Sequence, residues 1–218
     1  MKKEVRMKIT VFGATGGIGG HVVEQALDAG HHVTAVIRNS SRFETAHPAL
    51  GIVRVPGLTD PELLLPALEG SHAVISGVGP RGRKEGLIAT QLTRTILDAI
   101  GATYVRRFVA VSAAPVGTVP DGDSFVNRRL ILPFFSAFLR DLYADLTEME
   151  RQIQLSTTEW TVVRPPKLTS KPLTGTYRTA LGANVPRGYS ISRADTAHLM
   201  LATLDDPATI KQTIGIAY

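Results

Sequence analysis

A run of apolar residues leads directly into closely spaced glycines near the N-terminus, and this junction constrains the fold more than any other feature. Residues 9–12 form a short apolar segment, and Gly13, Gly16 and Gly19 follow it at intervals of three. This spacing is typical of a strand–turn–helix unit in which glycines allow a tight turn, a close backbone approach to phosphate, and close helix packing. The free amides that begin such a helix attract anions. The junction therefore predicts a turn that binds a pyrophosphate.

Strand-like and helix-like segments alternate along the rest of the chain. Strands are expected at 9–12, 32–37, 52–55, 73–76, 108–111 and 160–164, and helices at 21–29, 61–68, 86–100 and 139–153, with a last helix capped by Ser192. Short apolar strands that alternate with helices indicate a parallel sheet covered on both faces. We therefore predict an α/β fold, a Rossmann-like doubly wound parallel sheet, as a single domain over residues 1–218. Substrate-side elements are expected mainly from 115–145 and 165–190.

The composition limits the possible partners. A chain of 218 residues with 44% hydrophobic residues can bury a large core without cross-links, and the absence of cysteine excludes disulfides and thiolate chemistry. The net charge of +5 comes from basic residues scattered in twos and threes, and aromatic residues make up only 6% of the chain. Nucleic-acid binding normally needs a clustered basic surface, so we expect no nucleic-acid partner.

Metal and membrane partners are not expected either. The six histidines show no spacing with carboxylates that is typical of a metal site. No apolar run approaches the roughly 18 residues of a membrane span, and the charged N-terminus has no apolar signal segment. These features predict a cytoplasmic protein. Its oligomeric state is left open between a monomer and a homodimer.

The residue that ends the second predicted strand indicates which dinucleotide is bound. An acidic residue there accepts a hydrogen bond from a ribose 2′-hydroxyl, whereas an arginine pairs with a 2′-phosphate. Here the strand runs into Arg38, followed by Asn39, Ser40, Ser41 and Arg42. Two guanidinium groups among small polar side chains favour NADP(H) over NAD(H).

Four segments together carry a resemblance to a known family. They are Phe-Gly-Ala-Thr-Gly at 12–16, the arginine-containing loop at 36–42, Trp-Thr-Val-Val-Arg-Pro-Pro at 160–166, and Ile-Ser-Arg-Ala-Asp at 191–195. Over nearly its whole length the chain resembles the atypical short-chain dehydrogenase/reductases of the NAD(P)H-binding, NmrA-like type, a family that includes biliverdin-IXβ reductase, also called flavin reductase. The resemblance implies a Rossmann fold and a nicotinamide cofactor, and leaves the substrate open.

The resemblance and the strand order imply a cofactor site made from the residues that follow successive strands. The expected NADP(H)-binding residues are Gly13, Thr15, Gly16, Gly17, Ile18, Gly19, Arg38, Ser41, Arg42, Gly57, Leu58, Gly77, Val78, Gly79, Arg81, Ser112, Ala113, Pro165 and Pro166. In this arrangement the glycine turn and the arginine loop anchor the phosphates. The loop from Gly77 to Arg81 lies along the nicotinamide ribose, and the two prolines orient the ring.

The sequence departs from the wider superfamily where acid–base catalysis is expected. Carbonyl-reducing members use a Tyr-x-x-x-Lys pair, in which the lysine lowers the pKa of the tyrosine. No tyrosine of this chain has a lysine four positions later, and Leu146 stands where the lysine, or a histidine in the flavin-reductase branch, is expected. Ala113 and Ala114 occupy the usual positions of the reactive serine, and Leu58 replaces an acid near the adenine.

Ser112, Lys167, Asp145 and Tyr143 remain as candidate catalytic residues, because they are the polar side chains expected near the hydride position. Each has another interpretation. Lys167 can bind an anionic substrate or lie in solvent, and Asp145 can cap a helix or form an ion pair within the long helix at 139–153. The role of Tyr143 stays open.

These features predict an NADPH-dependent oxidoreductase that passes hydride to a small aromatic or conjugated acceptor of flavin, quinone, enone or tetrapyrrole type. Such acceptors delocalise charge, so they need positioning more than a proton donor. One alternative is a redox sensor that binds NADP(H) without catalysis. Another is an epimerase or dehydratase that holds NADP throughout its reaction. The apolar segment 130–139 is interpreted as either a lid over a flat substrate or a packing surface.

Overall fold

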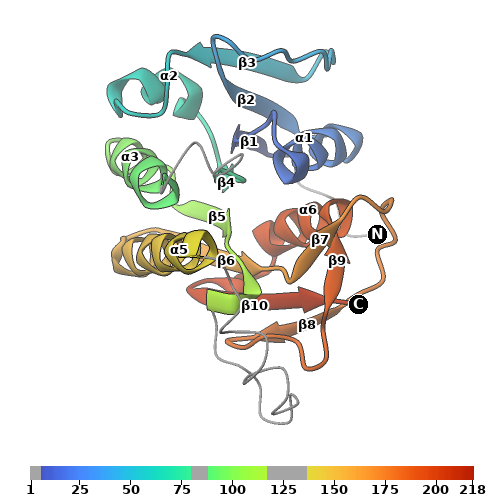
Figure 1. Ribbon diagram of the computed structural model, residues 1–218. Helices are drawn as coiled ribbons and strands as arrows, with labels where there is room; N and C mark the ends of the chain where they lie inside the picture. Colours follow the sequence, from blue (N-terminus) through green and yellow to red (C-terminus); the bar gives the residue numbers. More distant parts are fainter. Residues whose placement is uncertain (1–5, 80–87, 117–136) are drawn as a thin grey trace.

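One central sheet organises the computed structural model, which describes residues 6–79, 88–116 and 137–218 (Figure 1). Its strand order is β3-β2-β1-β4-β5-β6-β10-β8, and every neighbouring pair is parallel except β10 with β8. The chain builds outward from β1 to β3 and then crosses back to add β4 on the other side of β1. The order therefore reverses between β1 and β4, and the predicted doubly wound parallel fold is confirmed.

The elements have the following bounds in the described residues. The main sheet contains β1 (Lys8–Phe12), β2 (His32–Arg38), β3 (Leu50–Val55), β4 (Ala73–Ser76), β5 (Arg107–Val111), β6 (Glu159–Arg164), β8 (Arg178–Leu181) and β10 (Gln212–Ala217). A second, two-stranded sheet pairs β7 (Lys167–Thr169) with β9 (Ser190–Ser192). The α-helices are α1 (Gly17–Asp28), α2 (Leu65–Leu68), α3 (Ala89–Gly101), α5 (Ala137–Leu155) and α6 (Arg193–Ala202). Short 3₁₀ helices lie at Glu62–Leu64, Ala114–Val116, Thr203–Asp205 and Pro207–Thr209.

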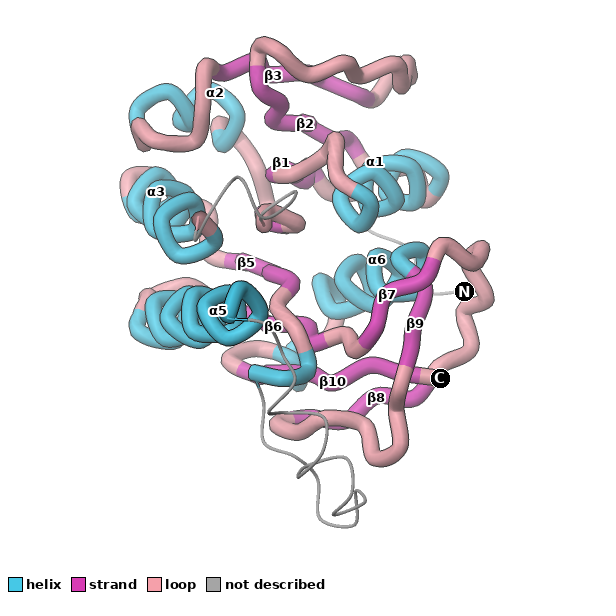
Figure 2. Tube along the Cα trace, viewed as in Figure 1, coloured by secondary structure: helices cyan, strands magenta, loops and turns pink. Residues whose placement is uncertain are grey.

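Helices cover both faces of the sheet, because the strands are apolar on both sides. In β1, Ile9 and Val11 are buried in the core beneath α1 and α6, whereas Phe12 is buried in the core beneath α2, α3 and α5. Figure 2 shows these two helical layers on opposite sides of the strands. Successive side chains of a strand point to opposite faces, so one apolar run supplies both cores. No helix in the described part of the chain is long and apolar enough to cross a membrane.

The predicted elements are present with shifted ends. Helix α1 begins at Gly17, four residues before the predicted start, because Gly16 already has the extended conformation of an N-cap. The predicted helix at 61–68 divides into a 3₁₀ turn and the short α2, whose first turn contains Pro66. A proline has no amide hydrogen to donate, so a regular α-helix does not run through this position from its N-terminal side.

Strands β7, β8, β9 and β10 were not predicted. β8 is a short, largely exposed edge strand that begins with Arg178 and Thr179, and β10 is interrupted by Gly215, so neither shows a clear apolar pattern. The stretch after residue 165, predicted to supply substrate-side elements, therefore also contributes strands to the main sheet. Its strands β8 and β10 extend the main sheet beyond β6, and β7 with β9 forms the small second sheet.

The start of α6 is organised by a buried carboxylate, that of Asp195. The Asp195 amide donates to Ser192 Oγ at 2.9 Å, which confirms the predicted helix cap. The carboxylate accepts from Tyr218 Oη at 2.6 Å and from the amides of Thr174 and Gly175 at 2.9 and 2.8 Å. Burial by itself would raise the pKa of Asp195, but these hydrogen bonds and that from Ser192 lower it to about 2.

We predict that Asp195→Asn lowers the free energy of unfolding by about 2 kcal/mol near neutral pH, because the amide cannot accept all of these hydrogen bonds. A carboxylate whose pKa is depressed in the folded state stabilises the protein above its unfolded pKa of about 3.9, and this contribution is lost as pH falls toward about 2. Urea unfolding of both proteins should therefore show the difference shrinking as pH falls below about 4. Asp98→Asn, at an exposed position of α3, is the control and should change little. A difference that stays constant with pH would contradict the prediction.

Candidate functional site

The turn between β1 and α1 has the backbone geometry that binds a pyrophosphate. Gly13 has a φ of +77°, and the Gly16 amide donates to the Gly13 carbonyl at 2.8 Å, which closes the turn. A Cβ atom on Gly19 would lie 2.2 Å from that same carbonyl oxygen, so only glycine lets the helix approach so closely. Gly16 caps α1 without a side-chain hydrogen bond, and the first turn holds no acidic residue. These features suit an anion at the start of α1.

A second glycine turn, after β4, lies against the first. The Gly77 amide donates to the Phe12 carbonyl at 2.9 Å, and a Cβ on Gly13 would lie 2.8 Å from the Gly77 carbonyl carbon. The next residue, Val78, is buried, whereas a Cβ on Gly79 would meet no atom within 4 Å. The backbone at Gly79 therefore borders open space at the switch point of the sheet. Arg81, expected to continue this loop, lies outside the described residues, as does segment 130–136 of the expected lid.

Four other residues of the expected cofactor site lie partly or fully buried, two of them in the first glycine turn and two in the loop after β3. Thr15 is partly buried in the turn, and Ile18 is buried in the core beneath α1. Gly57 and Leu58, which follow β3, are partly buried, and Leu58 packs against the core beneath α2 and α3. An aliphatic side chain at this place can contact an adenine face but cannot form the hydrogen bond of the acid that it replaces.

Arg38 is the last residue of β2 and is exposed at the carboxyl end of the strand, as the sequence predicts. The loop after it is ordered by backbone contacts, since the Ser41 amide donates to the Arg38 carbonyl at 2.9 Å and the Asn39 amide donates to Val55 at 2.8 Å. Arg42 is also exposed. From β3, Arg54 donates to the carbonyls of Asn39 and Ser41 at 3.4 and 3.2 Å. Arg54 was not expected in the site, and it braces this loop.

The loops after β5 and β6 are joined to each other at the same edge of the sheet. The Ser112 amide donates to Val163 at 2.8 Å, and the Ala114 amide donates to the Pro165 carbonyl at 2.9 Å. Asn184 completes the group by donating from Nδ2 to the Ala114 carbonyl at 2.7 Å. Ser112 Oγ is buried and has no hydrogen-bond partner among the described residues. Ala113 and Pro166 lie partly buried in the same loops.

Asp145 has a structural role. Its carboxylate accepts from the amides of Ala89 and Thr90 at 2.8 and 3.1 Å, and so caps the N-terminus of α3. Ile88, at the N-cap position, provides no side-chain hydrogen bond, so α5 supplies the cap that the sequence around α3 lacks. The alternative of a cap is therefore correct, although the capped helix is α3 and not α5. In the described structure the carboxylate of Asp145 therefore serves as the cap of α3.

Tyr143 and Lys167 have different surroundings. Tyr143 lies partly buried on α5 against the core, and burial raises the pKa of its phenol above the usual value of 10.0. A tyrosine that acts as a proton donor in the superfamily pair needs its pKa lowered, which is the opposite direction. Lys167 is exposed at the start of β7, directly after the two prolines. Its position is therefore open to an anionic molecule at this edge.

A buried ion pair holds the end of β6. Arg164 Nε donates to Glu150 Oε1 at 3.0 Å, and Arg164 Nη2 forms a second bond with Glu150 Oε2. The side chains of Arg164 and Glu150 are only 11% and 3% exposed. The pair connects α5 to the residue before Pro165, so it fixes where the proline loop begins.

Arg193 is a residue of the site that was not expected. It is the first residue of α6, and a Cβ on Gly17 would lie 2.6 Å from Arg193 Cδ and 2.9 Å from Nε. The side chain therefore crosses directly over the first residue of α1. Arg193 belongs to the segment Ile-Ser-Arg-Ala-Asp at 191–195, which carries part of the family resemblance, but nothing in the sequence near it indicates a contact with Gly17.

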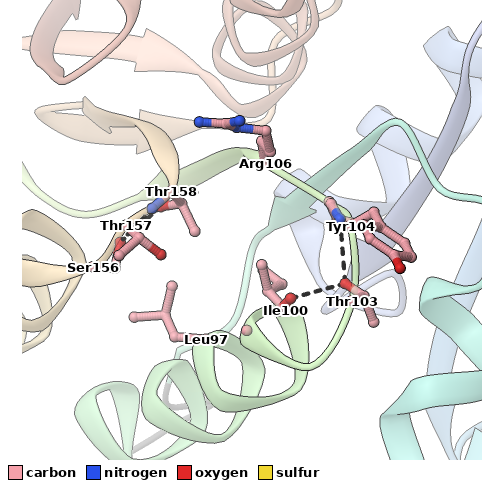
Figure 3. Close-up of a pocket in the computed structure, with 10 residues that line it drawn as sticks. Leu97, Ile100, Thr103, Tyr104, Arg106, Ser156, Thr157 and Thr158 are labelled. Carbon is pink, nitrogen blue, oxygen red and sulfur yellow. Dashed lines mark hydrogen bonds between the residues drawn. The ribbon is translucent and has the colours of Figure 1, made fainter.

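A hollow of about 310 Å³ lies at the opposite ends of the strands, where β5 and β6 begin (Figure 3). It is bounded by the end of α3, the loop before β5 and residues 156–158, and Thr103 in this loop donates to the Ile100 carbonyl at 2.8 Å. This is the edge where parallel strands β5 and β6 begin, whereas Rossmann-like sheets bind ligands at the edge where their strands end. We therefore place the candidate site at the glycine turns. In the described residues no group of three or more histidines, aspartates or glutamates is placed to hold a metal ion.

Comparison with known proteins agrees with this geometry. Residues 13–207 match the family model described as NAD(P)H-binding. An uncharacterized chloroplastic protein of Arabidopsis thaliana is 32% identical over 176 residues, which cover 77% of this chain and 61% of that protein. A protein of Bacillus subtilis described as an uncharacterized sugar epimerase is 27% identical over 211 residues, 93% of this chain and 90% of that protein. The chain thus spans about three fifths of the length of the first relative and nine tenths of the second.

A solved structure shares the fold over almost the whole chain. It is that of a candidate NADH-flavin reductase from Streptococcus pneumoniae, with a TM-score of 0.78 and 23% identity, covering 97% of this chain and 99% of that one. At this identity the likeness concerns the fold alone. The family match extends from Gly13, in the first glycine turn, past the end of α6. The resemblance seen in the sequence is therefore confirmed, and the chain belongs to the NAD(P)H-binding family and has a Rossmann-like fold.

Proposed function

We propose that this chain is an NADPH-dependent oxidoreductase that passes hydride to a small aromatic or conjugated acceptor of flavin, quinone, enone or tetrapyrrole type. The observation that carries the proposal is the pairing of a pyrophosphate-binding turn with two exposed arginines at the end of β2. The bound cofactor supplies the hydride from its reduced nicotinamide. The residues of the chain bind and orient the two reactants.

The preference for the phosphorylated cofactor rests on Arg38 and Arg42. No acidic residue occurs in the loop between them, so nothing there accepts a hydrogen bond from a ribose 2′-hydroxyl as a carboxylate would. A guanidinium group forms two parallel hydrogen bonds with a phosphate, and Arg54 keeps the loop in place by binding its carbonyls. This arrangement supports recognition of a 2′-phosphate.

The class of acceptor is supported by the state of the candidate acid–base groups. The carboxylate of Asp145 is engaged as the cap of α3, and burial raises the pKa of the Tyr143 phenol, which is the opposite of what the tyrosine of a Tyr-Lys pair needs. Reduction of a simple ketone needs a proton at the oxygen as the hydride arrives. A conjugated acceptor spreads the charge, and positioning by itself lowers the barrier by several kcal/mol.

Ser112 and Lys167 are the residues that we propose contact the acceptor or the nicotinamide. Buried hydroxyl groups almost always have a hydrogen-bond partner, and Ser112 Oγ has none among the described residues. A bound molecule can supply that partner at the end of β5. Lys167, exposed just after the proline loop, can pair with a carboxylate or phosphate of the acceptor.

A second candidate function is epimerisation with the dinucleotide held throughout the reaction. It is favoured by the similarity to the Bacillus subtilis protein, which extends over most of both chains. This reaction would oxidise and reduce the same substrate carbon in one turnover, so it would consume no net cofactor. It also needs a base. Asp145 caps α3 and burial raises the pKa of Tyr143, so Ser112 and Lys167 are the candidates that remain.

We predict that the purified protein oxidises NADPH when it is mixed with members of a panel of flavins, quinones and enones. The measurement is the loss of reduced-nicotinamide absorbance over time, with denatured protein as the blank. Simple ketones in the same panel should give little turnover, because the chain lacks the Tyr-Lys pair. Tight NADPH binding without consumption by any member would contradict the oxidoreductase proposal and favour a redox sensor or an epimerase.

We predict that Arg38→Asp weakens NADPH binding about 30-fold or more and changes NADH binding by less than about threefold. The substitution removes a cation from the 2′-phosphate and adds a repelling carboxylate, whereas NADH has no phosphate there. Titration of cofactor fluorescence measures both affinities. The matched control is Arg106→Asp, which makes the same charge change at an exposed position before β5, at the opposite edge of the sheet. Equal losses for NADPH and NADH would show that Arg38 does not recognise the phosphate.

A further inference from the structure

We propose that Arg193, the first residue of α6, binds the pyrophosphate of the dinucleotide at the start of α1. The proposal rests on the cofactor binding proposed above and goes beyond it by adding a contact from the C-terminal part of the chain. The glycine turn would then hold the pyrophosphate through backbone amides on one side, and α6 would supply a cation on the other.

The position of the side chain carries the proposal. The Arg193 side chain lies so close to Gly17 that an added Cβ would be 2.6 Å from Cδ and 2.9 Å from Nε. Gly17 is the first residue of α1, directly after the N-cap Gly16, and it is exposed. The guanidinium group is therefore within reach of the place where amides of the turn converge on an anion.

The charges around this position indicate what should lie between the two helices. The N-terminus of α1 carries a partial positive charge, and its first turn contains no acidic residue. Arg193 adds a full positive charge beside it, and in the described residues the guanidinium donates only to Ser170 Oγ, a neutral acceptor, at 3.2 Å. Two positive groups repel each other unless an anion neutralises them. A pyrophosphate carries the charge that this arrangement requires.

The packing of α6 holds Arg193 in this place. Helices α1 and α6 lie side by side (Figure 1), and Gln25 of α1 donates to the Ala194 carbonyl at 2.9 Å. Ser192 caps the first turn of α6, and the fully buried Asp195 connects that turn to residues 174–175. These hydrogen bonds hold the residues on either side of Arg193, so the backbone of Arg193 has a defined position close to Gly17.

The proposal separates Arg193 from Arg38 by the part of the cofactor that each recognises. NADPH, NADH and ADP-ribose all contain the pyrophosphate, whereas only NADPH carries the 2′-phosphate. Arg193→Gln should therefore weaken the binding of all three by about 10- to 100-fold, as expected for loss of a hydrogen bond between charged groups. It should leave the weak binding of adenosine 2′-monophosphate unchanged, because that molecule has no pyrophosphate.

The experiment measures the dissociation constants of these four molecules by calorimetry for the wild type, Arg193→Gln, Arg193→Lys and Lys171→Gln. Lys171→Gln removes one positive charge from the neighbouring loop, where the ammonium group lies 5.9 Å from the Tyr218 ring, and it should bind all four normally. Arg193→Lys should recover part of the affinity. Unchanged urea unfolding confirms that each variant is folded.

A second pair of variants tests the contact itself. Gly17→Ala keeps the charge of Arg193 but places a methyl group where its Cδ and Nε lie, so the side chain must move. The loss of NADPH affinity from Gly17→Ala should be several-fold smaller in the Arg193→Gln background than in the wild type. Equal losses in both backgrounds would contradict the contact.

The outcomes distinguish this inference from the proposed function. Normal binding of NADPH and NADH by Arg193→Gln would overturn the inference and leave the proposed function in place. A loss confined to NADPH would also overturn it, because Arg193 would then recognise the 2′-phosphate. A wild-type protein that binds none of the four molecules would overturn the proposed function itself.

Discussion

The contact between the glycine turns after β1 and β4 is the constraint on which the rest of the structure depends. A Cβ on Gly13 would lie 2.8 Å from the Gly77 carbonyl, and a Cβ on Gly19 would lie 2.2 Å from the Gly13 oxygen. Side chains at these positions would push α1 and the β4 loop away from β1. Their absence lets the amides that begin α1 meet the edge of the sheet at its switch point, where a dinucleotide binds in this type of fold.

The C-terminal part of the chain returns to this edge and completes the site. Asn184 binds the loop after β5 at the Ala114 carbonyl, and Arg193 lies over Gly17 at the start of α1. Asp195 ties the first turn of α6 to the preceding loop and to Tyr218, the last residue of the chain. The same segment therefore extends the sheet, through β10 and the edge strand β8, and supplies groups to the loop after β5 and to the start of α1.

Much of the fold could be predicted from the sequence because the patterns are local. The apolar run at 9–12 and the cap at Ser192 depend on residues within a few positions of each other, and both elements were predicted correctly. Strands β7 to β10 are short, exposed or interrupted by glycine, and they are stabilised by partners far along the chain. Asp145 shows the same limit, since its place in a charged helix gave no sign that it caps α3.

The sequence by itself determined the strand–glycine–helix turn and the arginine at the end of β2, because each needs only a fixed spacing along one short stretch of backbone. The tertiary structure decided which distant side chains join them. Arg193 is 176 positions from Gly17 along the chain, and the closeness of the two follows from the packing of α6 against α1. Packing of this kind depends on how all the elements fit together, so no local pattern encodes it.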